Sequence, residues 1–249
     1  MKRESMFDKL RRQKDKPAQI ELLRELWDIN SPMVLKANDN YQNTCRRLGI
    51  EAIESKLFIA GYLDSCYENA ILAAEAAEIT PHTVLDGGDR CLYICWHFRD
   101  YPAIRKELFK IKPLILIAQD ADWLVELTNA GFTFNFRTAK NFLRLIRSMK
   151  SGRPLVAMFD YCYEETRHIS IDFLSYNART PVGILHLAKR YGYRIQILGT
   201  QSGEIGTLKR ISCIEDVEVI AKEINKFLTA EIMAAPTHWI MWPALDQRI

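Results

Sequence analysis

Long hydrophobic runs are missing from this 249-residue sequence. Its longest apolar stretches, such as residues 114–118, are far shorter than the roughly 20 residues of a membrane-spanning helix. Glycine and proline are sparse and no short repeat is present, which excludes collagen-like and low-complexity chains. The net charge of +3 is too small to indicate nucleic-acid binding. With 48% hydrophobic residues, the sequence predicts a globular protein that buries a core.

An N-terminal apolar segment of the kind found in secretory signals is also missing, because residues 1–16 are mostly polar. We therefore expect a cytoplasmic location and reduced cysteines that pack as small hydrophobic residues. The spacing of the six cysteines matches no metal site, so no metal is expected. Basic residues outnumber acidic ones in residues 1–16. A solvated leader is one interpretation; a surface for an acidic carrier protein or for anionic lipid, hence peripheral membrane contact, is the other.

The periodicity of the chain changes near residue 85. Residues 17–80 place apolar side chains at helical spacing and end before Pro81. Short apolar runs typical of buried strands then follow at residues 91–96, 113–118, 153–159 and 193–198. Helices are predicted between and after them, at residues 103–111, 120–130, 141–149, 181–191 and 217–230. Residues 169–174 alternate as an antiparallel or edge strand does, and Gly203 and Gly206 indicate a hairpin or loop.

This order predicts an α/β fold with a mostly parallel sheet flanked by helices and a helical N-terminal subregion. No linker rich in glycine, proline or serine divides the chain. We therefore expect one domain over residues 1–249, in which residues 1–80 form the helical subregion.

Two ionisable residues directly follow predicted strands. His97 comes after the first strand and Asp160 after the third, and ligands of such sheets bind beyond the carboxyl ends of the strands. Asp100 is a further candidate, although it also suits the N-cap of the next helix. A buried, hydrogen-bonded structural histidine, or one exposed on a loop, is the alternative interpretation of His97. No nucleophile elbow, phosphate-binding loop or zinc-protease motif is present.

Four segments resemble the bacterial lipid A late acyltransferase family, within the lysophospholipid and glycerophosphate acyltransferase superfamily. They are the strand at residues 88–97, KSGRPLVAMFD at 150–160, FLSYNARTPVG at 173–183 and APTHWIMW at 235–242. They occur in the family's order, and the resemblance covers roughly residues 85–245. The family's fold agrees with the α/β fold expected from the sequence.

The sequence departs from the family's pattern at three points. The family has an acid five positions after its histidine, in an H-x4-[DE] motif, and this chain has Pro102 there. Ser175 replaces a family glycine. Family members usually also have an N-terminal membrane anchor, which is not evident in this sequence. The last departure favours a small or carrier-bound acceptor over lipid A.

The resemblance implies transfer of an acyl or aminoacyl group from a thioester to a hydroxyl or amine. The donor would be an acyl or peptidyl carrier protein, through its phosphopantetheine, or coenzyme A, with no tightly bound cofactor. His97 would act as general base. A carboxylate would hold its other ring nitrogen, and both Asp100 and Asp160 are candidates for that role.

Four further residues are candidates for binding the substrate. Arg137 and Arg179 are suited to the phosphate of a pantetheine arm or of the acceptor, although ordinary surface charge is an alternative. Ser175 and Thr180 lie in the segment that resembles the family. Two other functions remain open: a non-catalytic protein that binds an acyl or carrier-bound group, and a thioester hydrolase in which water replaces the acceptor.

Overall fold

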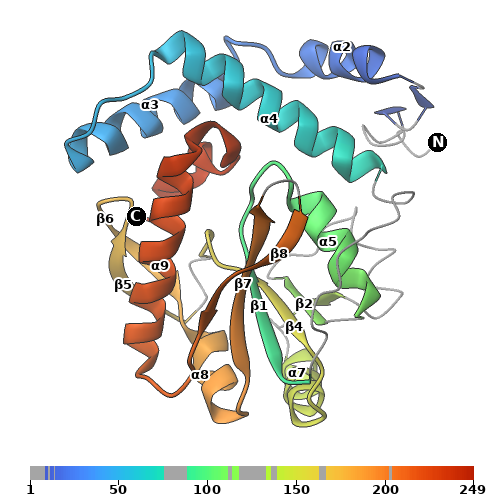
Figure 1. The fold of residues 1–249 in the computed structure, drawn as a ribbon, viewed down its shortest axis with the longest axis vertical. Coiled ribbons are helices and arrows are strands. Elements are labelled where there is room, and N and C mark those ends of the chain that lie inside the picture. The colour runs from blue at the N-terminus through green and yellow to red at the C-terminus, as the bar shows by residue number, and fades with distance from the viewer. Residues whose placement is uncertain are drawn as a thin grey trace.

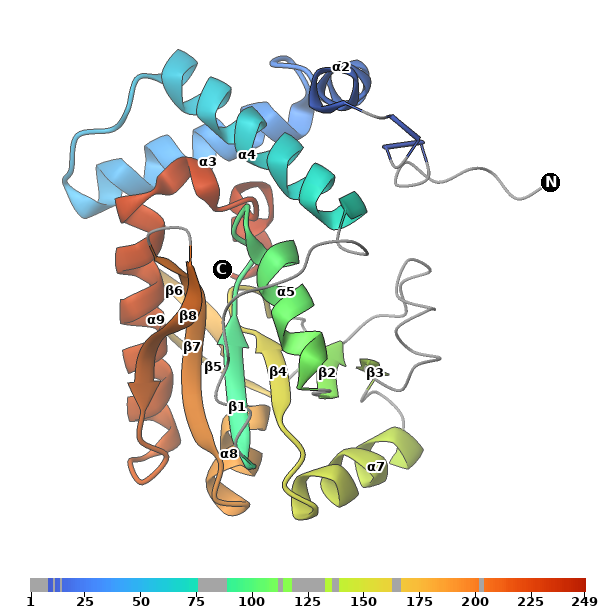
Figure 2. The same ribbon diagram turned by 45° about the vertical axis from the view of Figure 1, so that its right-hand side comes forward.

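The described residues up to Glu75 are mostly helical and lie across one end of the molecule (Figures 1 and 2). A computed structural model describes residues 9–10, 12–13, 15–75, 89–111, 114–117, 133–135, 139–162, 167–201 and 204–249. The N-terminal helices are α2 (Lys16–Leu26), α3 (Pro32–Leu48) and α4 (Ser55–Glu75). Asp15 and Ser31 cap the first two through their side chains, as Asp and Ser commonly do. None of the helices in these ranges is both long and apolar enough to cross a membrane.

A six-stranded sheet follows, and its strand order is β3-β2-β4-β1-β7-β8. The strands are β1 (Cys91–Cys95), β2 (Leu114–Ile117), β3 (Thr133–Asn135), β4 (Leu155–Met158), β7 (Arg194–Gln201) and β8 (Glu204–Ile211). All neighbours are parallel except β7 and β8, which form an antiparallel hairpin. The mostly parallel α/β sheet expected from the sequence is therefore confirmed. Strand β3 was not predicted, and the predicted helix 120–130 lies outside the described residues.

The alternating side chains of β1 show how the sheet is covered on both faces. Leu92 and Ile94 belong to the large core, which also contains side chains of α8 (Gly183–Arg190) and α9 (Val217–Ala234). Cys91, Tyr93 and Cys95 face the other way, into a smaller cluster with α5 (Tyr101–Lys110). This double burial explains why the strand is apolar at every position. A further helix, α7 (Ala139–Lys150), precedes β4.

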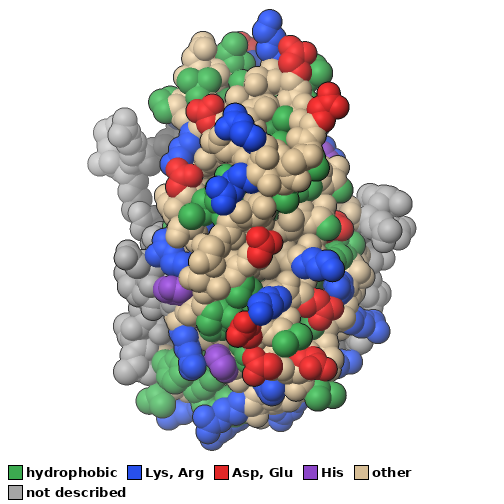
Figure 3. Space-filling model, turned by 90° about the vertical axis from the view of Figure 1, so that its left-hand side faces the viewer, with side chains coloured by type: hydrophobic (Ala, Val, Ile, Leu, Met, Phe, Trp, Pro, Cys, Tyr) green, Lys and Arg blue, Asp and Glu red, His purple; other side chains and the backbone are tan. Residues whose placement is uncertain are grey.

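The outer face of α9 is solvated and carries ion pairs. Lys222 Nζ lies 2.6 Å from a carboxylate oxygen of Glu218, and Lys209 Nζ lies 2.9 Å from Glu223. Figure 3 shows this side of the molecule, where basic and acidic side chains are interspersed. Such a mixed surface presents no field of one sign to a charged partner.

Strands β5 (His168–Phe173) and β6 (Tyr176–Pro181) form a hairpin of their own beside α9. The antiparallel strand expected at residues 169–174 is thus present, but outside the main sheet. Leu174 and Ser175 both have positive φ, of 53° and 65°, as a type I′ hairpin turn requires. Glycine adopts this conformation without strain, which explains the family glycine at this position. The helix predicted at 181–191 begins later, at Gly183, because β6 extends to Pro181.

The C-terminal tail crosses back between the N-terminal helices and the sheet. It contains two short 3-10 helices, η2 (Pro236–His238) and η3 (Trp242–Gln247). Tyr62 of α4 donates a hydrogen bond to the carbonyl of Ile240 at 2.9 Å. Asn40 of α3 donates to the carbonyl of Trp242 at 2.8 Å. The tail therefore connects the helical subregion to the end of the sheet where His97 lies.

Candidate active site

His97 and Asp160 lie side by side because their strands are neighbours. Strands β1 and β4 run parallel, and Cys95 is paired with Met158. His97 stands two positions after Cys95, and Asp160 two positions after Met158. The backbone N–H of Phe159 donates to the carbonyl of Cys95 at 3.0 Å, which extends the pairing beyond the strands. Both side chains therefore reach the carboxyl edge of the sheet, where ligands of this architecture bind.

The two side chains form a hydrogen-bonded acid–base pair. His97 Nδ1 lies 3.0 Å from Asp160 Oδ1, and the backbone N–H of His97 donates to Asp160 Oδ2 at 2.8 Å. The Asp160 side chain is fully buried, whereas the His97 side chain is 30% exposed. With Nδ1 protonated and facing Asp160, the lone pair of Nε2 is available to accept a proton from a substrate.

Trp239 supplies a further hydrogen bond to the carboxylate. Its indole N–H donates to Asp160 Oδ2 at 2.7 Å, and the Trp239 side chain is buried. A β-bridge between Phe98 and Trp239 joins the tail to the segment that carries His97. Trp239 was not among the candidate site residues of the sequence analysis. Its place in the family-like tail segment was the one signal that could have marked it.

The environment of Asp160 decides its charge. Burial alone would raise the pKa of this carboxyl group, because a buried charge loses its hydration. Attraction to His97 and hydrogen bonds from His97 and Trp239 act in the opposite direction and outweigh burial, so the pKa of Asp160 is lowered. Asp160 is therefore ionised at neutral pH and stabilises an imidazolium formed on His97.

Asp100, the other candidate partner of His97, lies elsewhere. Its carboxylate accepts a hydrogen bond from the hydroxyl of Thr200 on β7. Its backbone carbonyl accepts from Ala103 N–H at 3.0 Å, in the first turn of α5. The structure thus brings Asp160, and not Asp100, to the His97 ring.

Three of the four candidate substrate-binding residues lie in the described structure, and each of them contacts other parts of the chain. Thr180 is fully buried, and its hydroxyl accepts a hydrogen bond from Asn225 at 2.8 Å, so it ties β6 to α9. Arg179 is half-buried, and its guanidinium donates to the carbonyl of Gln247 in the tail. The carbonyl of Ser175 accepts from Arg47 in the hairpin turn. Arg137 lies outside the described residues. Within the described ranges, no three His, Cys, Asp or Glu side chains are grouped as metal ligands would be.

Comparison with known families agrees with these observations. The family model for bacterial lipid A biosynthesis acyltransferases matches residues 118–244, slightly more than half of the chain. The chain belongs to this acyltransferase family. Comparison with curated proteins finds no match.

The lipid A acyltransferase match contains Asp160 and Trp239. It begins at residue 118 and therefore does not include His97. The assignment of His97 therefore depends on its own motif and on its geometry. Pro102, which stands where the family motif has an acid, is buried in the first turn of α5. In this member of the family, the carboxylate beside the histidine comes from the neighbouring strand.

Proposed function

We propose that this member of the acyltransferase family transfers an acyl or aminoacyl group from a carrier-protein or coenzyme A thioester to a hydroxyl or amine. The acceptor is a small or carrier-bound molecule, and His97 acts as general base. The observation that carries the proposal is the pair of a part-exposed His97 and a buried, ionised Asp160, 3.0 Å apart. General bases are recognised by this geometry: one ring nitrogen is held by a carboxylate and the other is open to substrate.

In the proposed reaction, the two ring nitrogens of His97 have different roles. Nε2 takes the proton of the acceptor's O–H or N–H as the acceptor attacks the thioester carbonyl. The tetrahedral intermediate then collapses, its C–S bond breaks, and the imidazolium returns the proton to the leaving thiolate. Asp160 keeps its negative charge throughout and holds Nδ1–H in place. General base catalysis of this kind contributes roughly 10²- to 10⁴-fold in rate.

Two other functions, a non-catalytic binding protein and a thioester hydrolase, make different predictions about His97 and about the acceptor. A non-catalytic binding protein would be favoured by a His97 ring without a carboxylate beside it, and Asp160 occupies that place. A thioester hydrolase would use the same pair with water as the acceptor. Only the dependence of donor consumption on added acceptor separates hydrolysis from transfer.

The test is turnover of acyl-carrier and acyl-coenzyme A donors, measured as thiol release, with panels of alcohol and amine acceptors. His97→Ala is expected to lower transfer by about 10²- to 10⁴-fold while circular dichroism and the melting temperature stay close to those of the wild type. His186→Ala, which changes an exposed histidine of α8, is the matched control and should retain full activity.

Full turnover by His97→Ala would refute the role of His97. Thiol release that does not depend on any acceptor would show a hydrolase instead of a transferase. No turnover of either donor class by the wild type would refute the proposed activity.

A further inference from the structure

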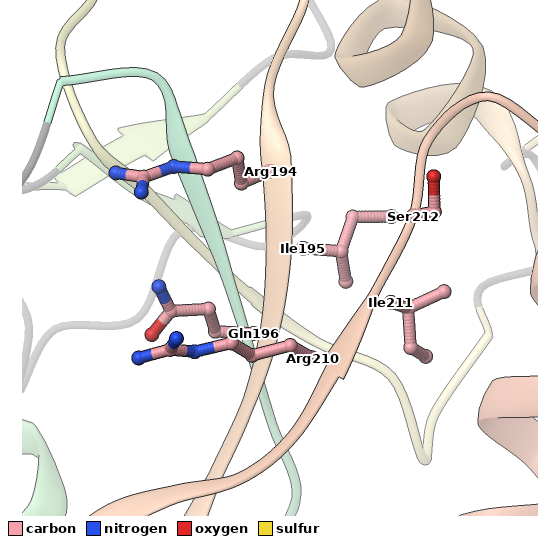
Figure 4. Close-up of a pocket in the computed structure, with 6 residues that line it drawn as sticks. All are labelled: Arg194, Ile195, Gln196, Arg210, Ile211 and Ser212. Atoms are coloured by element: carbon pink, nitrogen blue, oxygen red, sulfur yellow. The ribbon is translucent and has the colours of Figure 1, made fainter.

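A small basic pocket lies on the β7–β8 hairpin, at the level of the first half of β1 (Figure 4). Arg194 is the first residue of β7 and is paired with Cys91, the first residue of β1, whereas His97 follows the last. At about 3.3 Å per residue, His97 lies roughly 20 Å along the chain from Cys91 and roughly 13 Å from Tyr93, which is paired with Gln196. The pocket has a volume of about 260 Å³ and is lined by Arg194, Ile195, Gln196, Arg210, Ile211 and Ser212.

The hairpin register places three polar side chains on one face. Gln196 is paired with Arg210 across β7 and β8, and Arg194 lies two residues before Gln196 on the same side of its strand. Figure 4 shows both guanidinium groups and the amide on the same side of the hairpin. Ile195 and Ile211 point to the opposite face and are buried in the large core.

These three side chains offer N–H donors that no acceptor of the described residues occupies. Within the described part of the chain, neither guanidinium forms an ion pair. Gln196 is only 2% exposed, and its Oε1 accepts from the hydroxyl of Thr207 at 2.7 Å. Its amide –NH2 has no hydrogen-bond partner among the described residues and keeps some contact with solvent.

The electrostatics of the pocket also favour an anion. Arg194 and Arg210 occupy diagonal positions on neighbouring strands, where like charges repel. A planar guanidinium binds phosphate oxygens through two parallel N–H donors, and a second guanidinium beside it strengthens that binding. The volume is below the roughly 300–1,000 Å³ that whole small-molecule ligands occupy, so the pocket suits one charged group.

We propose that Arg194, Gln196 and Arg210 form a binding site for a phosphate or diphosphate group, separate from the His97–Asp160 pair. The group comes either as a free anion or as part of a phosphorylated carrier such as coenzyme A. Because Arg194 and Gln196 are paired with the first half of β1, whereas His97 follows its last residue, a ligand bound there does not contact the reacting atoms. The proposal does not depend on acyl transfer.

The test uses the whole protein at constant ionic strength, with binding measured by calorimetry and by amide chemical shifts. Inorganic phosphate and pyrophosphate should bind saturably, at about 1–10 mM or tighter, with the shifts centred on β7 and β8. Arg194→Gln/Arg210→Gln should weaken binding at least 10-fold, and Gln196→Ala by a smaller factor of about 3. Arg24→Gln/Arg46→Gln, which changes two exposed helical arginines, is the matched control and should bind as the wild type does.

Coenzyme A distinguishes the source of the phosphate. Equal affinity for pyrophosphate and coenzyme A, with both lost in the double variant, supports a site for the free anion. Much tighter coenzyme A binding with the same arginine dependence supports a phosphorylated carrier. Binding that the double variant retains, or no saturable binding of any of the three ligands to the wild type, would overturn the proposal.

Discussion

The charged side chains near the two ends of strand β1 differ in burial and in their partners. At the carboxyl end, the Asp160 carboxylate is fully buried and accepts three N–H hydrogen bonds from His97 and Trp239. At the amino end, Arg194 and Arg210 are exposed, and no acidic side chain of the described chain pairs with them. A buried charge has to be compensated within the protein, whereas water compensates an exposed one. The chain itself therefore compensates the charge of Asp160, whereas Arg194 and Arg210 remain accessible to an anionic ligand.

The largest expected effect is the loss of turnover when the negative charge of Asp160 is removed. Asp160→Asn keeps the size of the side chain but removes the charge that stabilises an imidazolium on His97. Turnover should fall by about 10³- to 10⁴-fold, with little change in KM. Steady-state kinetics of thiol release measure this, with Asp100→Asn as the control. Equal losses in the two variants would show that the carboxylate beside His97 has no special role.

The second effect concerns the hydrogen bond from the tail. Trp239→Phe removes the indole N–H that donates to Asp160, and we expect kcat to fall about 10-fold. Trp242→Phe is a matched control, because this buried indole donates instead to the carbonyl of Pro236 at 2.7 Å. Both variants should lose similar stability in thermal melts, and only Trp239→Phe should lose activity. Equal kcat values for Trp239→Phe and Trp242→Phe would show that Trp239 contributes only to packing.

The third effect is a dependence of stability on acid. The folded-state pKa of Asp160 lies below its ordinary value of 3.8, so its ionised form stabilises the folded protein above pH 3.8. This contribution is lost as the pH falls below 3.8 through the lower folded-state pKa. Besides His97, the titratable groups of the described residues that interact electrostatically with Asp160 are Cys95, Tyr101 and Arg248.

Urea unfolding of the wild type and Asp160→Asn measures this contribution. The difference between their free energies of unfolding should be about 2–4 kcal/mol at pH 7 and should narrow below pH 4. The double variant Arg194→Gln/Arg210→Gln serves as the control, because it should not alter the pH dependence. A difference between wild type and Asp160→Asn that stays constant with pH would mean that Asp160 is not compensated as the structure indicates.

The smallest effect is expected at Arg194 and Arg210. Arg210→Gln removes one of two like charges on neighbouring strands, so the melting temperature without ligand should rise by about 1–2 °C. Added pyrophosphate should raise the melting temperature of the wild type and raise that of the variant by less. Thermal melts at low ionic strength measure both changes. A lower melting temperature for the ligand-free variant would contradict the repulsion inferred for this pair.

Much of the fold could be read from local patterns. The apolar runs located β1, β2, β4 and β7, because strands covered on both faces need apolar residues at every position. Strand β6 escaped prediction because its sequence, YNARTP, is polar and ends in proline. It is held by pairing with β5 and by the contacts of Thr180 with α9, which no local pattern records.

The candidate site was also predictable from the sequence only in part. The sequence by itself determined that His97 and Asp160 follow strands, and therefore that both lie at the carboxyl edge of the sheet. It left two candidate partners for His97, and only the adjacency of β1 and β4 decided for Asp160. The tertiary structure alone also brought Trp239 to the carboxylate and grouped Arg194, Gln196 and Arg210. Side-chain identity and strand position are local properties, whereas strand order and the path of the tail are set by packing across long sequence separations.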